Sequence, residues 1–319
     1  ESERLALLKD HSHDESFIDE FRAIKWENKR RLCNLIQRTT GIDTDANSLF
    51  DVQIKRIHEY KRQLLNVLHV VSRYHAILAN PTADWVPRTV IFAGKAASSY
   101  TTAKQIIRLI NDVAVVVNQD SRLAGRLKVV FLPNYSVSLA EIIIPGADLS
   151  EQISTAGTEA SGTGNMKFAL NGALTIGTLD GATIEMRERV GADNMFTFGL
   201  RSDEIANLKS NGYRPEDIVS ADSDLAAVLD SIASGRFSPS EPERYRELLD
   251  GLIQGGDRYY LIADFASYRQ AQQQADELFR QSSRWTAATI ENVAGMGYFA
   301  SDRAIREYAE KIWRISPQR

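Results

Sequence analysis

The chain has 319 residues, 43% of them hydrophobic, which is enough for one large core or for two domains of about 150 residues each. Its net charge of -4 is the difference between 42 acidic and 38 basic residues, so there is no overall basic field and nucleic acid is not expected as a partner. The single cysteine, Cys33, excludes a disulfide framework within the chain and favours a reducing, cytoplasmic setting.

Neither a membrane span nor a metal centre is expected. No apolar run approaches the ~20 residues that a membrane helix requires, and the N-terminal residues lack the basic-then-apolar pattern of a signal peptide. The five histidines and one cysteine show no spacing that suits zinc.

The first quarter of the chain predicts a helix, a strand and a second helix. Residues 14–37 place apolar side chains at helical spacing between charged ones, and the helix is expected to end near Gly41. Leu49–Ile54 is typical of a strand. A helix then follows from about Leu64 and ends before Pro81.

Beyond this point, short apolar runs alternate with longer helical stretches. A helix is expected over about 100–118, and the chain turns mostly helical after 202. The runs typical of buried parallel strands are Thr89–Ala93, Lys128–Leu132, Ala173–Gly177 and Asn194–Phe198.

This alternation predicts an α/β fold with a doubly wound parallel sheet, in which ligands bind beyond the carboxyl ends of the strands. No internal repeat or convincing domain boundary is present, so residues 1–319 are treated as one domain. The aromatic residues of the final helices, about 283–319, suggest a docking surface.

The stretch Glu159–Leu170 has the features of a phosphate site. Gly162, Thr163 and Gly164 precede a helix-like apolar run, and flexible backbone at a helix N-terminus suits an anion. Lys167 would lie beside that anion, either as an ordinary phosphate contact or as an imine-forming amine. The plainer interpretation is a helix cap followed by a solvated lysine.

A second cluster, Lys55–Arg62, follows the predicted strand directly. It contains four Lys or Arg residues and His58 against one acid, Glu59. A solvated face is one interpretation. Alternatively, the mutual repulsion of these cations is offset by a bound anion at the ligand-bearing edge of the sheet. With the glycine-rich turn, the chain would offer two anion sites at one edge. Two phosphates held close together repel strongly unless they share a proton or cations surround them, so a site built to hold both is expected to move a proton.

Five segments resemble the glycogen/starch/maltodextrin phosphorylase family. Glu159–Phe168 and Asn171–Ala182 are similar to its pyridoxal phosphate signature, and Val52–Leu64 resembles its substrate-phosphate segment. Pro133–Tyr135 and Ser301–Arg303 also fit. The resemblance covers essentially the whole chain, but only the C-terminal half of the family's longer proteins.

The resemblance implies a role for each matching residue. Lys167 would form a Schiff base with pyridoxal 5′-phosphate and count with the catalytic residues. The other cofactor contacts would be Thr163, Gly164, Lys55, Tyr135 and Asn165. Arg56 and Lys61 would hold the substrate phosphate as catalytic residues. The substrate-binding residues would be Glu159, Ser161, Gly162, Tyr60 and His58.

The implied reaction is phosphorolysis of an α-1,4-glucan, glycogen or maltodextrin, to α-glucose 1-phosphate with retained configuration. The phosphate of the cofactor would pass a proton through the substrate phosphate to the departing oxygen. The implied architecture has two facing Rossmann-like domains (GT-B) in an allosteric homodimer. Because the N-terminal half would supply further contacts, this chain alone is expected to show little or no activity.

Two other classes of function remain open. A pyridoxal phosphate enzyme such as an aminotransferase would use Lys167 for imine chemistry, but would need an acid at the pyridine nitrogen and an Arg for a substrate carboxylate. A non-catalytic phosphate- or sugar-binding module would bind without turnover. A nucleotide-sugar glycosyltransferase would share the architecture, but no feature of the sequence calls for a nucleotide.

Overall fold

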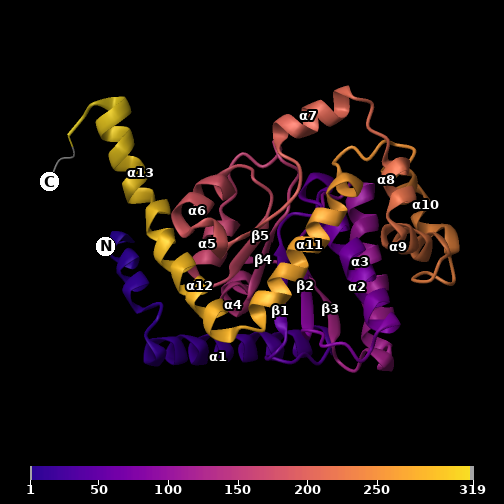
Figure 1. The fold of residues 1–319 in the computed structure, drawn as a ribbon, viewed down its shortest axis with the longest axis horizontal. Coiled ribbons are helices and arrows are strands. Elements are labelled where there is room, and N and C mark those ends of the chain that lie inside the picture. Colours follow the sequence, from indigo (N-terminus) through magenta and orange to yellow (C-terminus); the bar gives the residue numbers. More distant parts are fainter. Residues whose placement is uncertain (1, 317–319) are drawn as a thin grey trace.

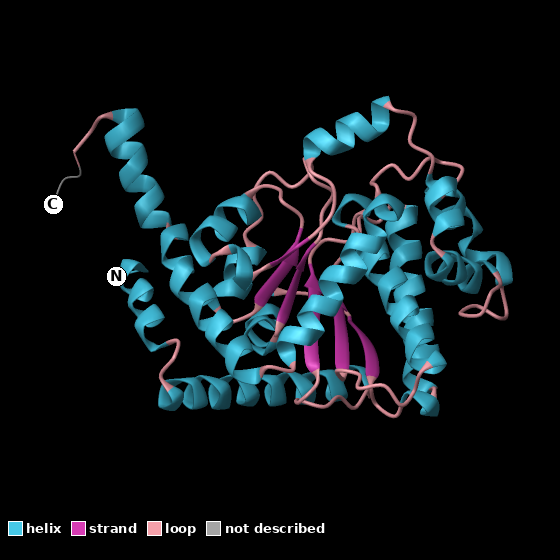
Figure 2. Ribbon diagram, in the orientation of Figure 1, coloured by secondary structure: helices cyan, strands magenta, loops and turns pink. Residues whose placement is uncertain are grey.

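The computed structural model describes residues 2–316 and centres on one parallel sheet (Figures 1 and 2). Six strands lie in the order β3-β2-β1-β4-β5-β6, and every pairing is parallel. The strands are β1 Leu49–Ile54, β2 Arg88–Ala93, β3 Leu127–Leu132, β4 Leu149–Gln152, β5 Leu174–Gly177 and β6 Phe196–Thr197. The doubly wound parallel sheet predicted from the alternating pattern is therefore confirmed.

Helices cover both faces of this sheet (Figure 2). The first seven are α1 Glu15–Thr40, α2 Gln63–Ala79, α3 Thr101–Gln119, α4 Val137–Gly146, α5 Gly164–Leu170, α6 Ala182–Val190 and α7 Ser202–Ser210. The chain continues with α8 Pro215–Ala221, α9 Ser223–Ala233, α10 Arg246–Leu252, α11 Leu261–Phe279, α12 Ser282–Gly295 and α13 Ser301–Glu307, followed by a π-helix, Tyr308–Trp313.

Local signals set the bounds of the first elements. Asp14 caps α1 by accepting hydrogen bonds from the backbone N–H groups of Ser16 and Phe17, and Gly41 ends the helix with φ +73°. β1 spans the residues predicted for it. Within residues 2–316, no helix is both long and apolar enough to cross a membrane.

The sequence pattern missed β4 and α4. β4 contains Ser150, Glu151 and Gln152, so it has no apolar run, yet it lies inside the sheet where partners satisfy its polar groups. As a result, the predicted fourth and fifth strands are β5 and β6, and β6 forms only over Phe196–Thr197.

Two apolar layers hold the helices to the sheet. One contains the buried residues of α2, α3 and α11, including Leu68, Ile106 and Phe265. The other contains those of α1 and α4 together with Phe168 of α5. Consequently α2 and α5, which follow neighbouring strands, cover opposite faces of the sheet.

A buried ionic network joins the sheet to α11. The fully buried guanidinium of Arg88, at the start of β2, donates to Asp51 of β1 at 2.9 Å and to Asp276 of α11 at 2.7 Å. It also donates to Gln272, whose amide in turn donates to Glu151 of β4 at 2.7 Å. The network therefore connects three strands to one helix.

The variant Arg88→Met should be strongly destabilised. It leaves two buried carboxylates without their shared cation, and breaking a buried pair typically costs about 3–5 kcal/mol. Urea denaturation followed by circular dichroism measures the loss. The control Arg108→Met breaks only an exposed pair with Glu241 and should leave the unfolding midpoint unchanged. Equal midpoints for the two variants would contradict the proposed importance of the network.

Candidate functional site

The two sequence motifs meet at the carboxyl edge of the sheet. Lys55 directly follows β1, and Gln152 is the last residue of β4, which pairs with β1. The ammonium of Lys55 donates a 2.9 Å hydrogen bond to Oε1 of Gln152. The structure thus confirms the expectation that both motifs lie where strands lead into helices.

Lys61 and Glu159 form an ion pair within this edge. Their Nζ and Oε2 atoms are 2.5 Å apart, and Ser154 Oγ donates to the same carboxylate oxygen at 2.9 Å. The Lys61 side chain is 11% exposed and that of Glu159 is 25% exposed, so solvent screens the pair only partly. A residue from each motif therefore contributes to one charged group.

The pKa values of Lys55 and Glu159 are both lowered at this edge. Burial lowers the pKa of Lys55 to about 8, against the opposing attraction of Glu159. Burial alone would raise the pKa of Glu159, but the hydrogen bond from Lys61 and the charges of both lysines bring it below its usual value. Glu159 is therefore an anion at neutral pH, and Lys55 is a cation that loses its proton readily.

A bound anion is not needed to offset the repulsion of all four cations in the basic cluster, contrary to what the sequence predicted. Arg62 is fully buried, and its guanidinium donates to Asp264 at 2.6 Å and to the carbonyl of Ile153 at 2.7 Å. Since Glu159 pairs with Lys61, two of the four cations have carboxylate partners within the chain. The sequence could not show this, because both acids lie far along the chain. Of the four Lys and Arg residues in the cluster, Lys55 and Arg56 form no ion pair within residues 2–316.

Asp180 holds the loop that carries Glu159. Its Oδ2 atom accepts the backbone N–H groups of Thr158 at 3.2 Å and of Glu159 at 2.8 Å. Gly181, at φ +50°, lies so close that a Cβ there would collide with the carbonyl oxygen of Glu159. The sequence placed Asp180 and Gly181 only within the segment Asn171–Ala182, with no role of their own, whereas in the structure they position the loop.

The predicted helix after the glycine-rich turn is α5, which begins at Gly164. Gly162 has φ +79°, and space is open where a Cβ at Gly164 would lie. The Lys167 side chain is exposed and makes no hydrogen bond or ion pair within residues 2–316. Asn165 is buried and its Oδ1 accepts the N–H of Met166, so it is engaged locally.

His58 and Tyr60 lie in a small aromatic group. The imidazole centroid is 4.5 Å from the ring of Tyr60 and 4.9 Å from that of Tyr100, and Nδ1 accepts the N–H of Tyr60. Burial lowers the pKa of His58, which favours a neutral ring. Tyr100, which the sequence analysis did not single out, donates its hydroxyl to Glu59 at 2.5 Å.

The remaining candidates lie around the edge without hydrogen bonds to this charged group. Tyr135 follows β3, is half-buried and packs against the core beneath α1 and α4. Arg56 and Thr163 are exposed, and Ser161 Oγ donates only to the carbonyl of Gly162. The geometry therefore pairs Lys61 with Glu159 directly, places Lys55 near enough for its charge to act on Glu159, and leaves the other predicted contacts to be tested.

The fold and this edge define the class of protein: a doubly wound α/β protein with a cationic and carboxylate site at the carboxyl ends of its strands. Residues 1–315 match the family of carbohydrate phosphorylases, and the chain belongs to that family. It is 57% identical over 314 residues to glycogen phosphorylase from Pasteurella multocida and 55% identical to that from Haemophilus influenzae. It is 48% identical over 313 residues to the human liver form of glycogen phosphorylase.

These relatives are much longer than the chain. Each alignment covers 98% of the chain but only 37% or 38% of the relative. The chain therefore spans less than two fifths of their length, which agrees with the partial resemblance seen in the motifs.

The variant Asp180→Ala should loosen the loop that holds Glu159. Removing its carboxylate leaves the backbone N–H of Glu159 without an acceptor, whereas that of Thr158 keeps the carbonyl of Thr155 at 3.1 Å. We therefore expect the Glu159 amide to exchange its hydrogen about tenfold faster. Hydrogen exchange read by mass spectrometry measures this change. The exposed Asp193→Ala is the matched control. Unchanged exchange in Asp180→Ala would show that other contacts hold the loop.

Proposed function

We propose that the chain is the C-terminal catalytic part of an α-1,4-glucan phosphorylase, which cleaves glycogen or maltodextrin with phosphate to give α-glucose 1-phosphate with retention. The observation that carries the proposal is the group formed by Lys55, Lys61 and Glu159 at the carboxyl edge of the sheet. It places cations for a phosphate beside a carboxylate that can accept sugar hydroxyls.

The residues at this edge fit pyridoxal 5′-phosphate. Lys55 is a desolvated cation whose hydrogen-bond partner is a neutral amide, so it has capacity for a phosphate oxygen. Lys167 offers an unengaged amine that would hold the cofactor covalently. Thr163, Gly164, Asn165 and Tyr135 complete the proposed contacts. When bound, the cofactor supplies a phosphate group that serves as the proton donor of the reaction.

The substrate phosphate would be held by Arg56 and Lys61. Arg56 presents an exposed guanidinium, whose planar fork suits two phosphate oxygens. The ammonium of Lys61 uses one donor for Glu159 and retains two more. Glu159 thus orients Lys61 without consuming its capacity to bind an anion.

The sugar would contact Glu159, the carboxylate of the group formed by Lys55, Lys61 and Glu159. The lowered pKa of Glu159 keeps it ionised, and an ionised carboxylate accepts hydrogen bonds from two hydroxyls. We assign Ser161, Gly162, Tyr60 and His58 to the same sugar. The neutral imidazole of His58 would offer its second ring nitrogen to a hydroxyl.

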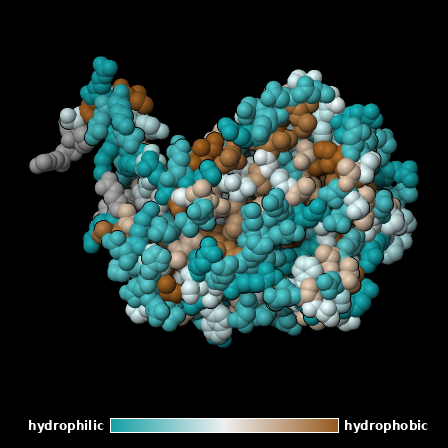
Figure 3. Space-filling model, in the orientation of Figure 1, coloured by the Kyte–Doolittle hydropathy of each residue, from teal (hydrophilic) through white to brown (hydrophobic). Residues whose placement is uncertain are grey.

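We infer that the missing N-terminal half closes over this edge as the second domain of a GT-B enzyme and docks on the C-terminal segment. Figure 1 shows that α13 and residues 308–316 project from the body, and Figure 3 shows an apolar patch on this projection. Its exposed side chains are Ile305, Tyr308, Ile312, Trp313 and Ile315. Trp285 in α12, by contrast, is buried in the chain's own core, so docking depends on residues 301–316. The complete enzyme would be a homodimer.

Pyridoxal 5′-phosphate should label Lys167. After incubation and borohydride reduction, peptide mapping is expected to place the adduct on this residue because its amine is exposed and unengaged. Lys167→Ala should lose the label, while the exposed control Lys209→Ala keeps it. An adduct that persists in Lys167→Ala would refute the assignment.

Activity should require both halves. The purified chain alone should release little glucose 1-phosphate from maltodextrin and phosphate, and coexpression with the N-terminal part of the Pasteurella multocida relative should restore release. In that pair, Arg56→Met or Lys61→Met should lower the rate by about 10²-fold or more, because each removes a cation from the reacting phosphate.

The control for this experiment is Lys104→Met, an exposed lysine on α3, which should keep the full rate. Binding of maltodextrin and phosphate by the pair without turnover would instead favour the non-catalytic binding module. Turnover by the chain alone at the rate of the pair would contradict the need for a second half.

A further inference from the structure

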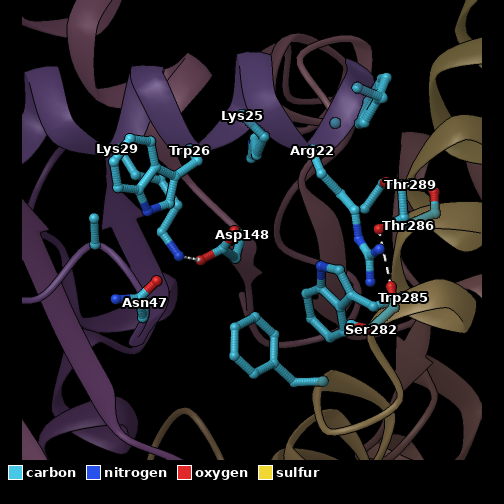
Figure 4. Close-up of a pocket in the computed structure, with 14 residues that line it drawn as sticks. Arg22, Lys25, Trp26, Lys29, Asn47, Asp148, Ser282, Trp285, Thr286 and Thr289 are labelled. Atoms are coloured by element: carbon cyan, nitrogen blue, oxygen red, sulfur yellow. Dashed lines mark hydrogen bonds and ion pairs between the residues drawn. The ribbon is translucent and has the colours of Figure 1, made fainter. Parts of the chain in front are cut away.

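A cavity lies at the end of the sheet opposite the candidate site, between α1 and α12 (Figure 4). It has a volume of about 300 Å³, and its floor is formed by loops that lead into the amino ends of the strands, at Asn47, Asp148 and Gly172. The candidate catalytic edge is at the carboxyl ends. The two sites are therefore separate, and the proposed phosphorolysis does not use this cavity.

The cavity wall combines aromatic rings with basic side chains. Four rings line it, from Phe21, Trp26, Phe279 and Trp285. Arg22, Lys25 and Lys29 stand on one side of α1 at spacings of three and four residues, so a single helix face presents all three cations. Asp148 is the one acid among the lining residues.

Only one of the three cations is neutralised inside the cavity. Lys29 is buried and bonds to Asp148 at 2.5 Å and to the carbonyl of Ser48 at 2.7 Å. Arg22 pairs at 3.4 Å with Asp19, whose side chain is 77% exposed and which lies outside the cavity lining. Lys25 donates at 3.1 Å to a neutral acceptor, the carbonyl of Asn171. The cavity thus carries an excess of positive charge.

Of Arg22 and Lys25, Lys25 is the cation that has only a neutral hydrogen-bond acceptor. Its side chain is half-buried near Lys29, and burial lowers its pKa to about 8 against the attraction of Asp148. In Figure 4, Arg22 extends from α1 toward Trp285, beside the open space between that ring and the Asp148–Lys29 pair, and Lys25 lines the same cavity. An anion in this space would contact both and recover the lost solvation.

We propose that this cavity binds a small planar aromatic molecule with one anionic group, such as an aromatic carboxylate. Its ring lies among the four aromatic side chains, and its carboxylate lies between Arg22 and Lys25. Inorganic phosphate alone would leave the apolar wall in contact with water, whereas a neutral hydrocarbon would leave Arg22 and Lys25 without an anion inside the cavity. Both features together select an aromatic anion.

The probe is 2-naphthoate, compared with the neutral 2-naphthalenemethanol of similar shape. Two of the chain's four tryptophans line the cavity, so binding should quench tryptophan fluorescence in a saturable way. The naphthoate should bind at least about tenfold more tightly than the alcohol, because its charge gains a charge-assisted hydrogen bond.

The variants Lys25→Met and Arg22→Met should each weaken naphthoate binding by about tenfold and leave the affinity for the alcohol unchanged. Lys104→Met, on α3 outside the cavity, is the charge-matched control and should bind as the parent does. Circular dichroism verifies that every variant is folded. Trp26→Phe with Trp285→Phe should remove most of the quenching.

Three results would overturn the proposal. Absence of saturable quenching by either probe would show that the cavity binds no such ligand. Equal affinity for the two probes would exclude recognition of the anion. Naphthoate binding unaffected by Lys25→Met and Arg22→Met would place the ligand elsewhere. None of these results tests phosphorolysis, so failure of one proposal does not affect the other.

Discussion

The rest of the sheet depends on the pairing of the buried Arg88 guanidinium with Asp51 and Asp276. Removing a charge from water costs several kcal/mol, so Arg88 is tolerated only while Asp51 and Asp276 remain in contact with it. Those carboxylates belong to β1 and α11, and Gln272 extends the network to β4. The requirement for pairing therefore ties α11 to the two strands whose carboxyl ends carry the candidate site.

The network contains two cations, Arg73 and Arg88, and three acids. Its charges therefore balance if one of the carboxyl groups of Asp51, Asp276 and Glu151 keeps its proton. Burial, together with the neighbouring Asp51, raises the pKa of Glu151 well above its usual range. Asp51 faces Arg88 directly, so Glu151 is the better place for the proton. Arg73 and Arg88 then oppose Asp51 and Asp276, two cations against two anions. A neutral network is what a water-free interior can hold.

Sequence patterns predicted the elements whose environment is apolar and missed those whose polar groups are satisfied by distant partners. β1 and α1 follow from hydrophobic spacing and caps. β4 does not, because its Glu151 finds Tyr268 and Gln272 more than a hundred residues later. For the same reason the sequence located both site motifs at one edge but could not show that Lys61 pairs with Glu159.

The strand order explains why the two motifs meet. β1 has β2 on one side and β4 on the other, so the chain reverses its direction of winding between β1 and β4. The helices that follow these strands, α2 and α5, pack on opposite faces, which opens a crevice at their carboxyl ends. The hydrogen bond from Lys55 to Gln152 spans this point. A ligand there would contact loops from both halves of the sheet, and a phosphate site beside a sugar site needs residues from two such loops.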